Sequence, residues 1–420
     1  MSEWQVKTLG EITDWYSGGT PSKQNEEFWG GKIPWISART LKGTRVSTSE
    51  TTITLEGLNN GSRLANKGEL LILVRGSGLF NAIPIAIVEE PVAFNQDIKA
   101  IKVKKEFEYI SPWFLLYWLH SNKRILNGIM EETGIGAGKF DLPLLKGLTI
   151  EIPSQEELVE ITKTIKSIDD KITLLRQQNE TLEQLAQTLF KRWFVEFEFP
   201  ISAALAASMG KQELEGQPYK SSGGAMINSK LGEIPEGWRV GKLGEIVTNY
   251  DSKRIPLSKN ERVKRQGGYP YHGATSIMDY VDDFIFDGRF VLLGEDGSVI
   301  DDKGYPVLQF VEGKIWVNNH AHVLKGRAPF TTEYFYLLVR KMKVRHIVTG
   351  AVQLKINQGN LNGVEVLIPI DKLLQEFDKL IKPIIDKTFI NKNEIQTLTK
   401  LRDTLLPKLM SGEVRVKMEE

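Results

Sequence analysis

The sequence contains no cysteine among its 420 residues, so it offers no disulfide bond, no thiolate zinc site and no cysteine nucleophile. It has no apolar run long enough to cross a bilayer, and its start, MSEWQVKTLGEI, lacks the basic-then-apolar pattern of a secretory signal. Only five histidines occur, and none stands in a context that predicts a Ser-His-Asp site. We therefore expect a cytoplasmic protein with no membrane partner.

A strong charge imbalance is also lacking, because 54 Lys and Arg face 53 Asp and Glu and leave a net charge of +1. This balance neither proves nor excludes a nucleic-acid partner, since binding needs a local basic surface. Hydrophobic residues make up 41% and charged residues 25%, as in globular proteins. The length exceeds that of one ordinary core and predicts two or three domains.

The chain repeats itself. Trp4-Gln-Val-Lys-Thr-Leu-Gly-Glu-Ile12 recurs as Trp238-Arg-Val-Gly-Lys-Leu-Gly-Glu-Ile246, with Trp, Val, Leu, Gly, Glu and Ile at the same spacing. Further matches follow in order: Gly68–Leu73 with Gly288–Leu293, Thr133–Pro153 with Thr349–Pro369, Asp170-Lys171 with Asp386-Lys387, and Thr188-Leu189 with Thr404-Leu405. Self-similarity of this kind indicates a tandem duplication.

Each repeat has a strand-rich part and a helical part. Short β-rich runs such as Leu70–Val74, Ile85–Val88, Val291–Leu293 and Lys314–Val317 are punctuated by Gly, Asn and Pro. One short helix is expected in each strand-rich part, at Ser111–Leu119 and at Thr332–Val339. We predict an α+β fold: two mixed α/β domains at 1–153 and 231–369, long helices at 154–198 and 370–412, and a connector at 199–230 without a core of its own.

The helical parts carry heptad seams, interrupted by Asn179 in the first and by Thr388 and Asn391 in the second. Ser154 with Glu157 predicts a capping box at the start of the first helix, which would measure roughly 65 Å at 1.5 Å per residue. Pro383 predicts a kink or a late start in the second helix. Two such helices can bury their seams on each other as an antiparallel, coiled-coil-like pair. The seam positions are Ile161, Ile165, Ile168, Ile172, Leu175, Asn179, Leu182, Ala186 and Leu189, and Phe377, Ile381, Ile384, Thr388, Asn391, Ile395, Leu398, Leu405 and Leu409.

Taken in order, these features resemble the DNA-specificity subunit of type I restriction–modification enzymes over nearly the whole chain. The motifs that carry the resemblance are Leu9-Gly-Glu-Ile12, Ser17-Gly-Gly-Thr-Pro21, Ile33-Pro-Trp-Ile36, Leu189-Phe-Lys-Arg-Trp-Phe-Val-Glu-Phe197, Leu231-Gly-Glu-Ile-Pro-Glu-Gly-Trp238, Gly304-Tyr-Pro306 and Val317-Asn-Asn-His320. No single motif decides the family, whereas the ordered set on a duplicated frame is specific.

The resemblance implies a chain that does no chemistry. Each α/β domain would be a target-recognition domain that reads one half of a split, asymmetric site on double-stranded DNA. The helices would hold two methyltransferase subunits and, in the full complex, two restriction subunits. This chain would bind no cofactor; S-adenosylmethionine would belong to the methyltransferase, and ATP and Mg²⁺ to the restriction subunit.

Residues that contact DNA are expected in basic and polar loops, because Lys and Arg meet phosphates and Arg, Asn, Gln, Ser and Thr meet base edges. In the first repeat the candidates are Ser17, Thr20, Ser22, Lys23, Lys32, Arg39, Lys42, Arg45, Arg75 and Lys139. In the second they are Lys253, Arg254, Lys259, Arg262, Lys264, Arg265, His272 and Lys355. For the bulky end of the first helix, both a partner interface and packing on the second helix stay open; its residues are Leu185, Leu189, Phe190, Trp193 and Phe194.

Other functions have weaker support. Gly134–Lys139 fails as a phosphate-binding loop, because Thr133 replaces the first glycine and Phe140 the magnesium-binding hydroxyl. Asp302, Glu312 and Lys314 have the spacing of a magnesium-dependent endonuclease, although Asp301–Gly304 also reads as a hairpin turn. His320 and His322 share a strand face but lack a third metal ligand nearby. A coiled-coil adaptor without a DNA role is the remaining alternative.

Overall fold

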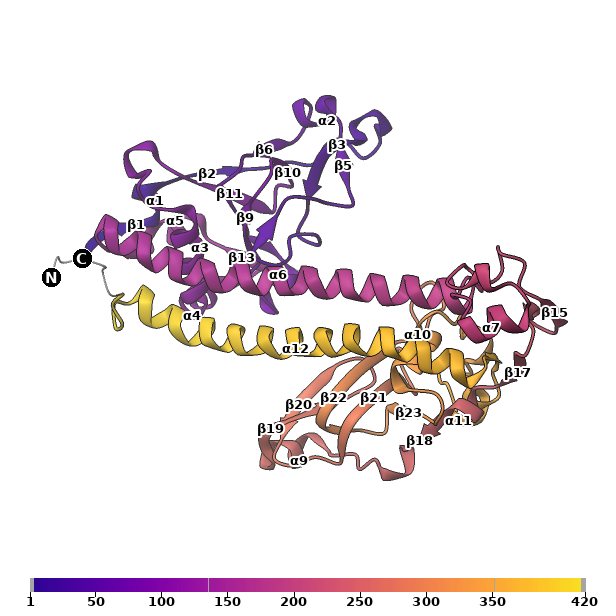
Figure 1. Cartoon of the computed structure of the whole chain (residues 1–420). Coiled ribbons are helices and arrows are strands. Elements are labelled where there is room, and N and C mark those ends of the chain that lie inside the picture. The colour runs from indigo at the N-terminus through magenta and orange to yellow at the C-terminus, as the bar shows by residue number, and fades with distance from the viewer. Residues whose placement is uncertain (1–3, 135, 351, 417–420) are drawn as a thin grey trace. The chain divides into compact units, whose positions relative to one another are not determined.

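The computed structural model describes residues 4–134, 136–350 and 352–416. These fall into two compact units, and each unit takes one end of both long helices (Figure 1). Unit 1 runs to Leu174 and resumes at Ile395, whereas unit 2 is Leu175–Glu394. Within the part of the chain that the structure describes, none of the helices combines the length and the hydropathy of a membrane span.

The two long helices are α6 (Gln155–Phe194) and α12 (Asp371–Met410), each 40 residues long. The Oγ of Ser154 accepts a hydrogen bond from the backbone N–H of Glu157 at 3.3 Å, which starts α6 where the sequence predicts. The reciprocal half of the expected capping box does not form, because the Glu157 carboxylate instead accepts from Trp4 and Arg415. The expected late start of α12 is wrong, since this helix begins before Pro383 and continues through it.

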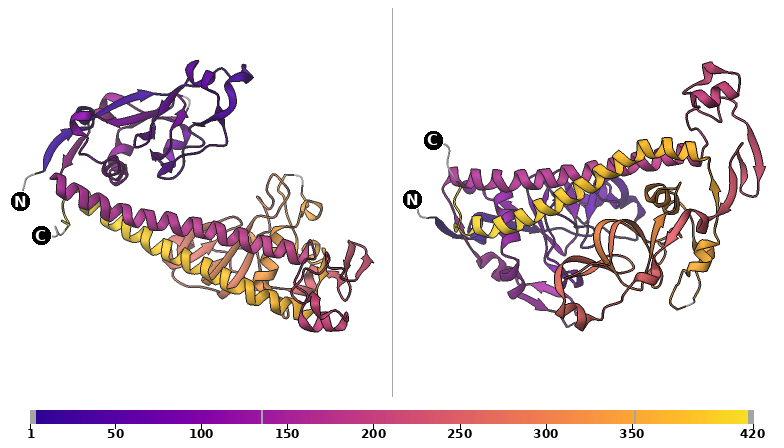
Figure 2. Two further views of the ribbon diagram at one scale, coloured as in Figure 1. Left: turned by 45° about the horizontal axis from the view of Figure 1, so that its top comes forward. Right: turned by 60° about the horizontal axis from the view of Figure 1, so that its bottom comes forward.

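The helices pack on each other in antiparallel order, as expected. In unit 1, Arg402 of α12 donates to the buried carboxylate of Asp169 of α6 at 2.8 Å. In unit 2, the Nδ2 of Asn391 donates to the Oδ1 of Asn179 at 3.0 Å. The first part of α6 therefore meets the last part of α12, and the reverse holds in unit 2; the views in Figures 1 and 2 agree. A polar pair inside an apolar seam fixes the register of the two helices.

Unit 1 contains four small sheets, ordered β1-β14, β5-β3-β10-β6, β2-β11-β7-β9-β4 and β12-β13-β8. Its strands are β1 (Gln5–Thr8), β2 (Thr13–Ser17), β3 (Trp29–Ile36), β4 (Arg45–Val46), β5 (Thr52–Ile53), β6 (Arg63–Ala65), β7 (Leu70–Leu73), β8 (Arg75–Gly76), β9 (Ile85–Val88), β10 (Val92–Phe94), β11 (Ile98–Val103), β12 (Met130–Glu132), β13 (Gly138–Phe140) and β14 (Thr149–Ile152). Its short helices are α1 (Leu9–Ile12), α2 (Leu55–Asn59), α3 (Pro112–Ser121), α4 (Lys123–Gly128) and α5 (Leu142–Gly147), with 3₁₀ turns η1 (Glu26–Phe28), η2 (Ser77–Phe80) and η3 (Lys105–Phe107).

Unit 2 is built on one six-stranded sheet, β18-β23-β21-β22-β19-β20, beside the pairs β15-β16 and β17-β24. Its strands are β15 (Met226–Ser229), β16 (Gly232–Pro235), β17 (Arg239–Lys242), β18 (Val247–Asn249), β19 (Gln266–His272), β20 (Ile277–Val281), β21 (Phe286–Gly294), β22 (Leu308–Val317), β23 (Ala321–Gly326) and β24 (Glu365–Ile368). Its shorter helices are α7 (Ala203–Ser208), α8 (Leu243–Ile246), α9 (Lys259–Lys264), α10 (Thr332–Arg340) and α11 (Gln358–Asn362), with 3₁₀ turns η4 (Gln212–Leu214), η5 (Asp251–Lys253) and η6 (Arg345–Ile347).

The duplication seen in the sequence is repeated in the strand pairing. The two LGEI segments form α1 and α8, and each leads into a strand whose first residue pairs with the end of a later strand. Thr13 of β2 pairs with Val103 of β11, and Val247 of β18 pairs with Gly326 of β23. Counted from these pairs, the Ser17–Lys99 pair of unit 1 corresponds to Asp251 and His322 in unit 2.

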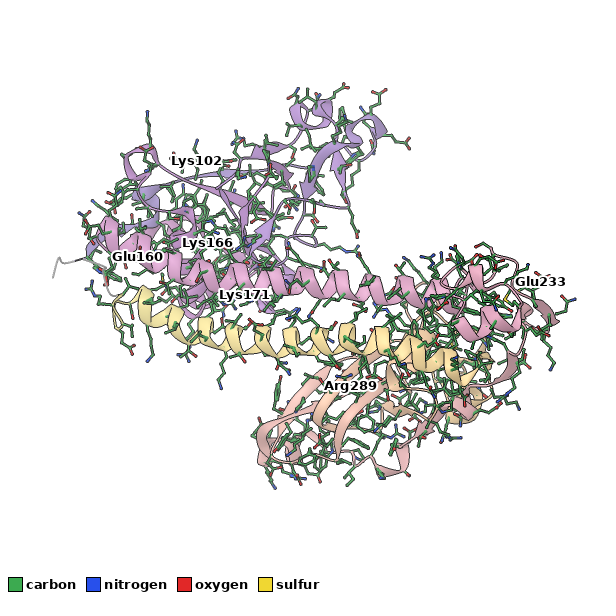
Figure 3. The ribbon with its side chains drawn as sticks, in the orientation of Figure 1. Lys102, Glu160, Lys166, Lys171, Glu233 and Arg289 are labelled. Carbon is green, nitrogen blue, oxygen red and sulfur yellow. The ribbon has the colours of Figure 1, made fainter. Side chains whose placement is uncertain are left out.

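An arginine fixes each sheet to its long helix. In unit 1, Arg45 donates to Glu89 and to Asp170 of α6 at 2.9 and 2.5 Å. In unit 2, Arg289 of β21 (labelled in Figure 3) donates to Asp386 of α12, the repeat counterpart of Asp170, at 2.5 Å. Both arginine side chains are less than one-fifth exposed, whereas Asp170 and Asp386 are 44% and 39% exposed, so each ion pair lies at the edge between the sheet and its helix.

The connector has no separate core and packs into that of unit 2. Tyr219 stacks on Phe199 at 4.6 Å between ring centroids, and Phe199 stacks in turn on Trp238 at 5.9 Å. All three rings are more than nine-tenths buried. The composition of this segment favours a linker, but its aromatic residues attach it to the entrance of the second strand-rich part.

A candidate DNA interface

A groove of about 420 Å³ in unit 1 gathers cationic side chains from three strands. Arg75 of β8 and Lys139 of β13 lie directly opposite each other in an antiparallel pair, and Lys99 of β11 lines the same groove. Both Arg75 and Lys139 are exposed, and none of the three forms an ion pair with any described residue. The sequence places them far apart, and the fold brings them together.

Arg75 and Lys139 repel each other across the strand pair, although Glu131 lies opposite Lys139 on the other side and Asp97 and Asp141 line the groove. Like charges directly opposite each other across a strand pair destabilise a sheet. Burial lowers the pKa of the Lys99 ammonium, and the positive charge of Lys146 lowers it further. A phosphate placed in the groove would remove this repulsion and receive charge-assisted hydrogen bonds. The geometry therefore favours an anionic ligand at this position.

Polar groups beside the cations could contact base edges. Lys99 donates to the Oγ of Ser17, and Thr20 donates to the Oε1 of Gln96 at 2.7 Å. Gln96 lines the groove together with the carboxylates of Asp97 and Asp141. Glutamine suits adenine and carboxylates accept from the amino group of cytosine in the major groove. The groove thus combines the residue types of phosphate contact and of base readout.

The corresponding place in unit 2 has the opposite electrostatic character. Lys355 is the repeat counterpart of Lys139, and its bridge partner is Asp296, where unit 1 has Arg75. His322 takes the place of Lys99 and donates to Asp251 at 2.5 Å. Lys355 pairs with Glu295 at 3.4 Å. The same position in the fold is an unpaired cationic groove in unit 1 and an internally neutralised cluster in unit 2.

The basic loop of unit 2 divides into free and engaged cations. Lys253, Lys259 and Lys264 are exposed and make no ion pair with a described residue. Arg262 and Arg265 instead pair with Asp279 and Asp282. Their guanidinium groups also lie over the rings of Tyr271 and Trp316, at 5.1 and 4.7 Å from the centroids. The lysines keep their charge available for phosphate, whereas the two arginines shape the loop.

The structure gives three further candidates internal roles. Arg45 binds Glu89 and Asp170, and Arg254 is 12% exposed and binds Glu295 and the carbonyl oxygen of Ala321. His272 is buried, faces Gln309 at 2.8 Å, and has a pKa lowered by burial. Because these groups are already bound and little exposed, we leave them out of the proposed interface. Ser22, Lys23, Lys32, Arg39 and Lys42 are exposed in unit 1 but do not line the groove, so their DNA contact stays a prediction.

Comparison with known proteins gives the chain its family. The model of the type I restriction modification DNA specificity domain matches residues 1–184 and 235–400, once in each repeat. The chain belongs to this family. It is 28% identical over 439 residues to the type I restriction enzyme MjaIX specificity subunit of Methanocaldococcus jannaschii, which covers 99% of this chain and 94% of the relative.

A second relative has the same family name, and one solved structure has a similar fold. The EcoR124I/EcoR124II specificity subunit of Escherichia coli is 35% identical over 176 residues, 41% of this chain and 42% of the relative. The crystal structure of a type I restriction–modification S subunit from M. genitalium has a TM-score of 0.58 at 16% identity and covers 99% of this chain and 97% of that one. At this identity the structure supports the fold alone. The expected family and the duplicated α+β fold are confirmed.

For the bulky end of α6, the sequence left two alternatives open: a partner interface or packing on α12. Phe190, Trp193 and Phe194 are each at most 6% exposed and lie in the core of unit 2. Their rings contact Phe377 of α12 at 4.8 to 6.1 Å. The structure therefore supports the packing alternative for these three residues, because buried side chains cannot meet a partner. Leu189 packs partly against the same core, and only Leu185 is exposed, at 45%.

Two residues of the endonuclease alternative, Glu312 and Lys314, are engaged in other contacts. Glu312 is bound by Arg289 at 2.8 Å, and the ammonium of Lys314 lies over the ring of Phe284. The backbone N–H groups of Lys303 and Tyr305 donate to Asp301, which makes the 301–304 segment the turn that the sequence also allowed. Among the described residues, only Asp251, Glu295 and His322 lie close enough to share a metal ion. Arg254 occupies the space between those carboxylates with its own ion pairs.

Sequence reasoning missed Lys99, Gln96, Asp251 and Glu295. Lys99 lies in β11 and Gln96 shortly before it, and nothing in the sequence places this segment beside Arg75 and Lys139. The useful signal was the duplication itself: the Thr133 and Thr349 segments align Lys139 with Lys355. Following the strands that pair with these two residues leads to the remaining members of both clusters.

Proposed function

We propose that this chain is the DNA-reading subunit of a type I restriction–modification complex, in which each strand-rich part reads one half of a bipartite site. The observation that carries the proposal is the groove of Arg75, Lys99 and Lys139, an unpaired cationic cluster beside polar groups that suit base edges. The comparisons support DNA specificity as a property of the family. The differing clusters of the two units support two different half-sites.

The proposal includes no chemistry by this chain. S-adenosylmethionine would bind to the methyltransferase partner, and ATP and Mg²⁺ to the restriction partner. In the described residues the candidate catalytic groups are held in ion pairs or turns. This chain would contribute cations that bind phosphates and polar groups that contact base edges. Its two long helices would bind the other subunits.

Partner binding is best supported on the outward faces of the two helices. Leu174 and Leu185 of α6 are 48% and 45% exposed, and their repeat counterparts Ile390 and Leu401 of α12 are 56% and 44% exposed. Exposed positions of a tandem repeat have no packing reason to stay alike, so apolar residues at exposed counterpart positions are candidates for contact with a partner. Unit 1 contains Leu174 with Leu401, and unit 2 contains Ile390 with Leu185.

Two matching apolar pairs fit two copies of one partner. We therefore assign these four residues, in place of the aromatic cluster, to the docking surface of the two methyltransferase subunits. Two restriction subunits would join the same complex.

The test uses the chain assembled with its methyltransferase subunit. Mapping of methylated adenines identifies the bipartite target, and binding to that duplex is then measured against salt concentration. The triple variant Arg75→Gln/Lys99→Gln/Lys139→Gln should bind more weakly at low salt, with the slope of log affinity against log salt reduced by up to about 2.7.

The matched control removes three charges elsewhere in unit 1. Lys67→Gln/Lys105→Gln/Arg124→Gln changes exposed residues that do not line the groove and should leave the slope nearly unchanged. Equal slopes for the groove variant and the wild type would remove the groove from the footprint. Failure of the wild-type complex to bind or methylate any duplex would overturn the proposed function itself.

A further inference from the structure

A buried histidine in unit 2 is surrounded by groups that require it to carry a positive charge. His322 is 1% exposed. Its Nε2 lies 2.8 Å from the carbonyl oxygen of Ile356, and its Nδ1 lies 2.5 Å from the Oδ2 of Asp251. Both neighbours are acceptors that have no proton to give. Both ring nitrogens must therefore donate, and an imidazole that donates from both nitrogens is the cationic form.

The charges around His322 come from every element packed against it. Asp251 in η5 and Glu295 after β21 face the ring, the latter at 3.8 Å. Arg254 pairs with both carboxylates, and Lys355 pairs with Glu295. Burial opposes the charged imidazole, but the carboxylates outweigh it and raise the pKa of His322 above its ordinary 6.5. The cluster joins two carboxylates to three cationic groups when the histidine is protonated.

The bonds made by this cluster join separate loops. Asp251 also accepts from the backbone N–H of Val323 at 2.8 Å, and the N–H of Ile356 donates to the carbonyl oxygen of Glu295 at 2.9 Å. Through these contacts His322 connects the segment after β18, the segment after β21 and the loop before α11. Those loops carry Lys253 and Lys355, the candidate phosphate contacts next to the cluster.

We propose that the protonated form of His322 is the positioning element of the second recognition unit, holding the loops that carry Lys253 and Lys355 where they meet DNA. The inference rests on the proposed function, because it concerns how the second half-site is read. His322 itself is buried and does not touch DNA; it acts through Asp251 and Ile356. Loss of the Nδ1 proton would place a lone pair against the Asp251 carboxylate and release the loop.

The direction of the pH effect follows from the raised pKa. A group whose pKa is raised by folding stabilises the folded arrangement at low pH, and this contribution is lost as the pH rises through the folded-state pKa. Affinity for the second half-site should therefore be constant at acidic pH and fall at least several-fold as the pH rises past the folded-state pKa of His322. Contacts to the first half-site should not change in this step, because Lys99 takes the place of His322 there.

The experiment measures the affinity of the assembled complex for its mapped duplex from pH 5.5 to 9 at constant ionic strength, with hydroxyl-radical footprints of each half. His322→Gln should bind the second half weakly at every pH and lose the pH step. Asp251→Asn should move the step to lower pH, because the imidazolium loses its carboxylate while Val323 keeps an acceptor. Lys cannot replace His322 in this test, because an amine does not titrate in the same range.

The control is His272→Gln, which changes the other buried histidine of unit 2. His272 faces neutral Gln309, and burial lowers its pKa, so its loss should leave the pH step unchanged. Hydrogen exchange at Val323 and Ile356 follows the loops directly and gives a result even if a variant binds DNA poorly. A wild-type profile without the step, or a His322→Gln profile that keeps it, would overturn the inference. Such a result would leave the proposed function intact as long as the wild type binds and methylates its duplex.

Discussion

The two units place different charges at the same position of a shared fold. In unit 1 the position holds Arg75, Lys99 and Lys139 without carboxylate partners. In unit 2 the counterparts are Asp296, His322 and Lys355, joined to Asp251 and Glu295. Duplication preserved the strand pairing while the charges diverged. A recognition domain can therefore change its ligand surface without changing the framework that supports it.

The entrances to the two units differ as well. Trp238 is 4% exposed and stacks on Phe199, against Phe194 and Phe197, in a continuous aromatic core. Its counterpart Trp4 is half-buried, donates to Glu157 at 3.1 Å and lies under the guanidinium of Arg415. In unit 2 the chain runs through this position, whereas in unit 1 residues near both ends of the chain meet there. The same tryptophan is a core residue in one unit and a polar-edged contact in the other.

The largest difference between the units is expected from the two tryptophans. Trp238→Ala should destabilise unit 2 by about 3–5 kcal/mol, as for other buried aromatic residues. Trp4→Ala should cost unit 1 about 1–2 kcal/mol, the scale of one hydrogen bond and one cation–π contact. Urea unfolding followed by hydrogen exchange in peptides from each unit separates the two values. Equal losses would show that the entrances are energetically equivalent.

The two helices should not differ in how strongly they bind a partner, because Leu185 and Leu401 lie at counterpart positions. Leu185→Lys and Leu401→Lys place a charge at counterpart positions, and each should weaken binding of one methyltransferase copy by about tenfold or more. Native mass spectrometry should then show complexes with one copy in place of two. Leu55→Lys, which changes a more exposed leucine in α2 that lies outside the two long helices, is the control. A chain that keeps both copies in each variant would exclude these leucines from the interface.

The smallest expected effect compares the counterpart lysines. Lys139→Gln should weaken DNA binding by a few-fold and lower the salt slope by about 0.9, as for one lost phosphate contact. Lys355→Gln should change the slope less, because Lys355 already pairs with Glu295 at 3.4 Å. Fluorescence anisotropy across a salt series measures both. Equal slope changes would mean that the ion pair with Glu295 does not weaken the contact of Lys355 with DNA.

The repeat and the helices could be predicted because they depend on local pattern. A heptad seam predicts a helix wherever it occurs, and Ser154 starts α6 because its hydroxyl oxygen accepts a hydrogen bond from the backbone N–H of Glu157. At Pro383 the expected late start is wrong, because α12 begins before this residue and continues through it, while the expected kink stays a prediction. The strands at Leu70–Leu73 and Ile85–Val88 also follow their apolar runs.

The site was harder to predict because charge alone does not show what a side chain already binds. Arg45, Arg254, Arg262 and Arg265 look like DNA contacts in the sequence, yet each meets a carboxylate in the fold. Nothing in the sequence distinguishes Lys99 from the other lysines of the chain. The aromatic end of α6 looks like an interface, but Phe377 and Tyr334 cover it.

By itself the sequence determined the duplication, the two long helices and the family, since periodicity and ordered motifs are written along the chain. Tertiary structure alone decided which cations are free and which are neutralised. Strand pairing sets Arg75 against Lys139 in one unit and Lys355 against Asp296 in the other. The energy of a charge depends on its neighbours in space, and those neighbours come from distant parts of the chain.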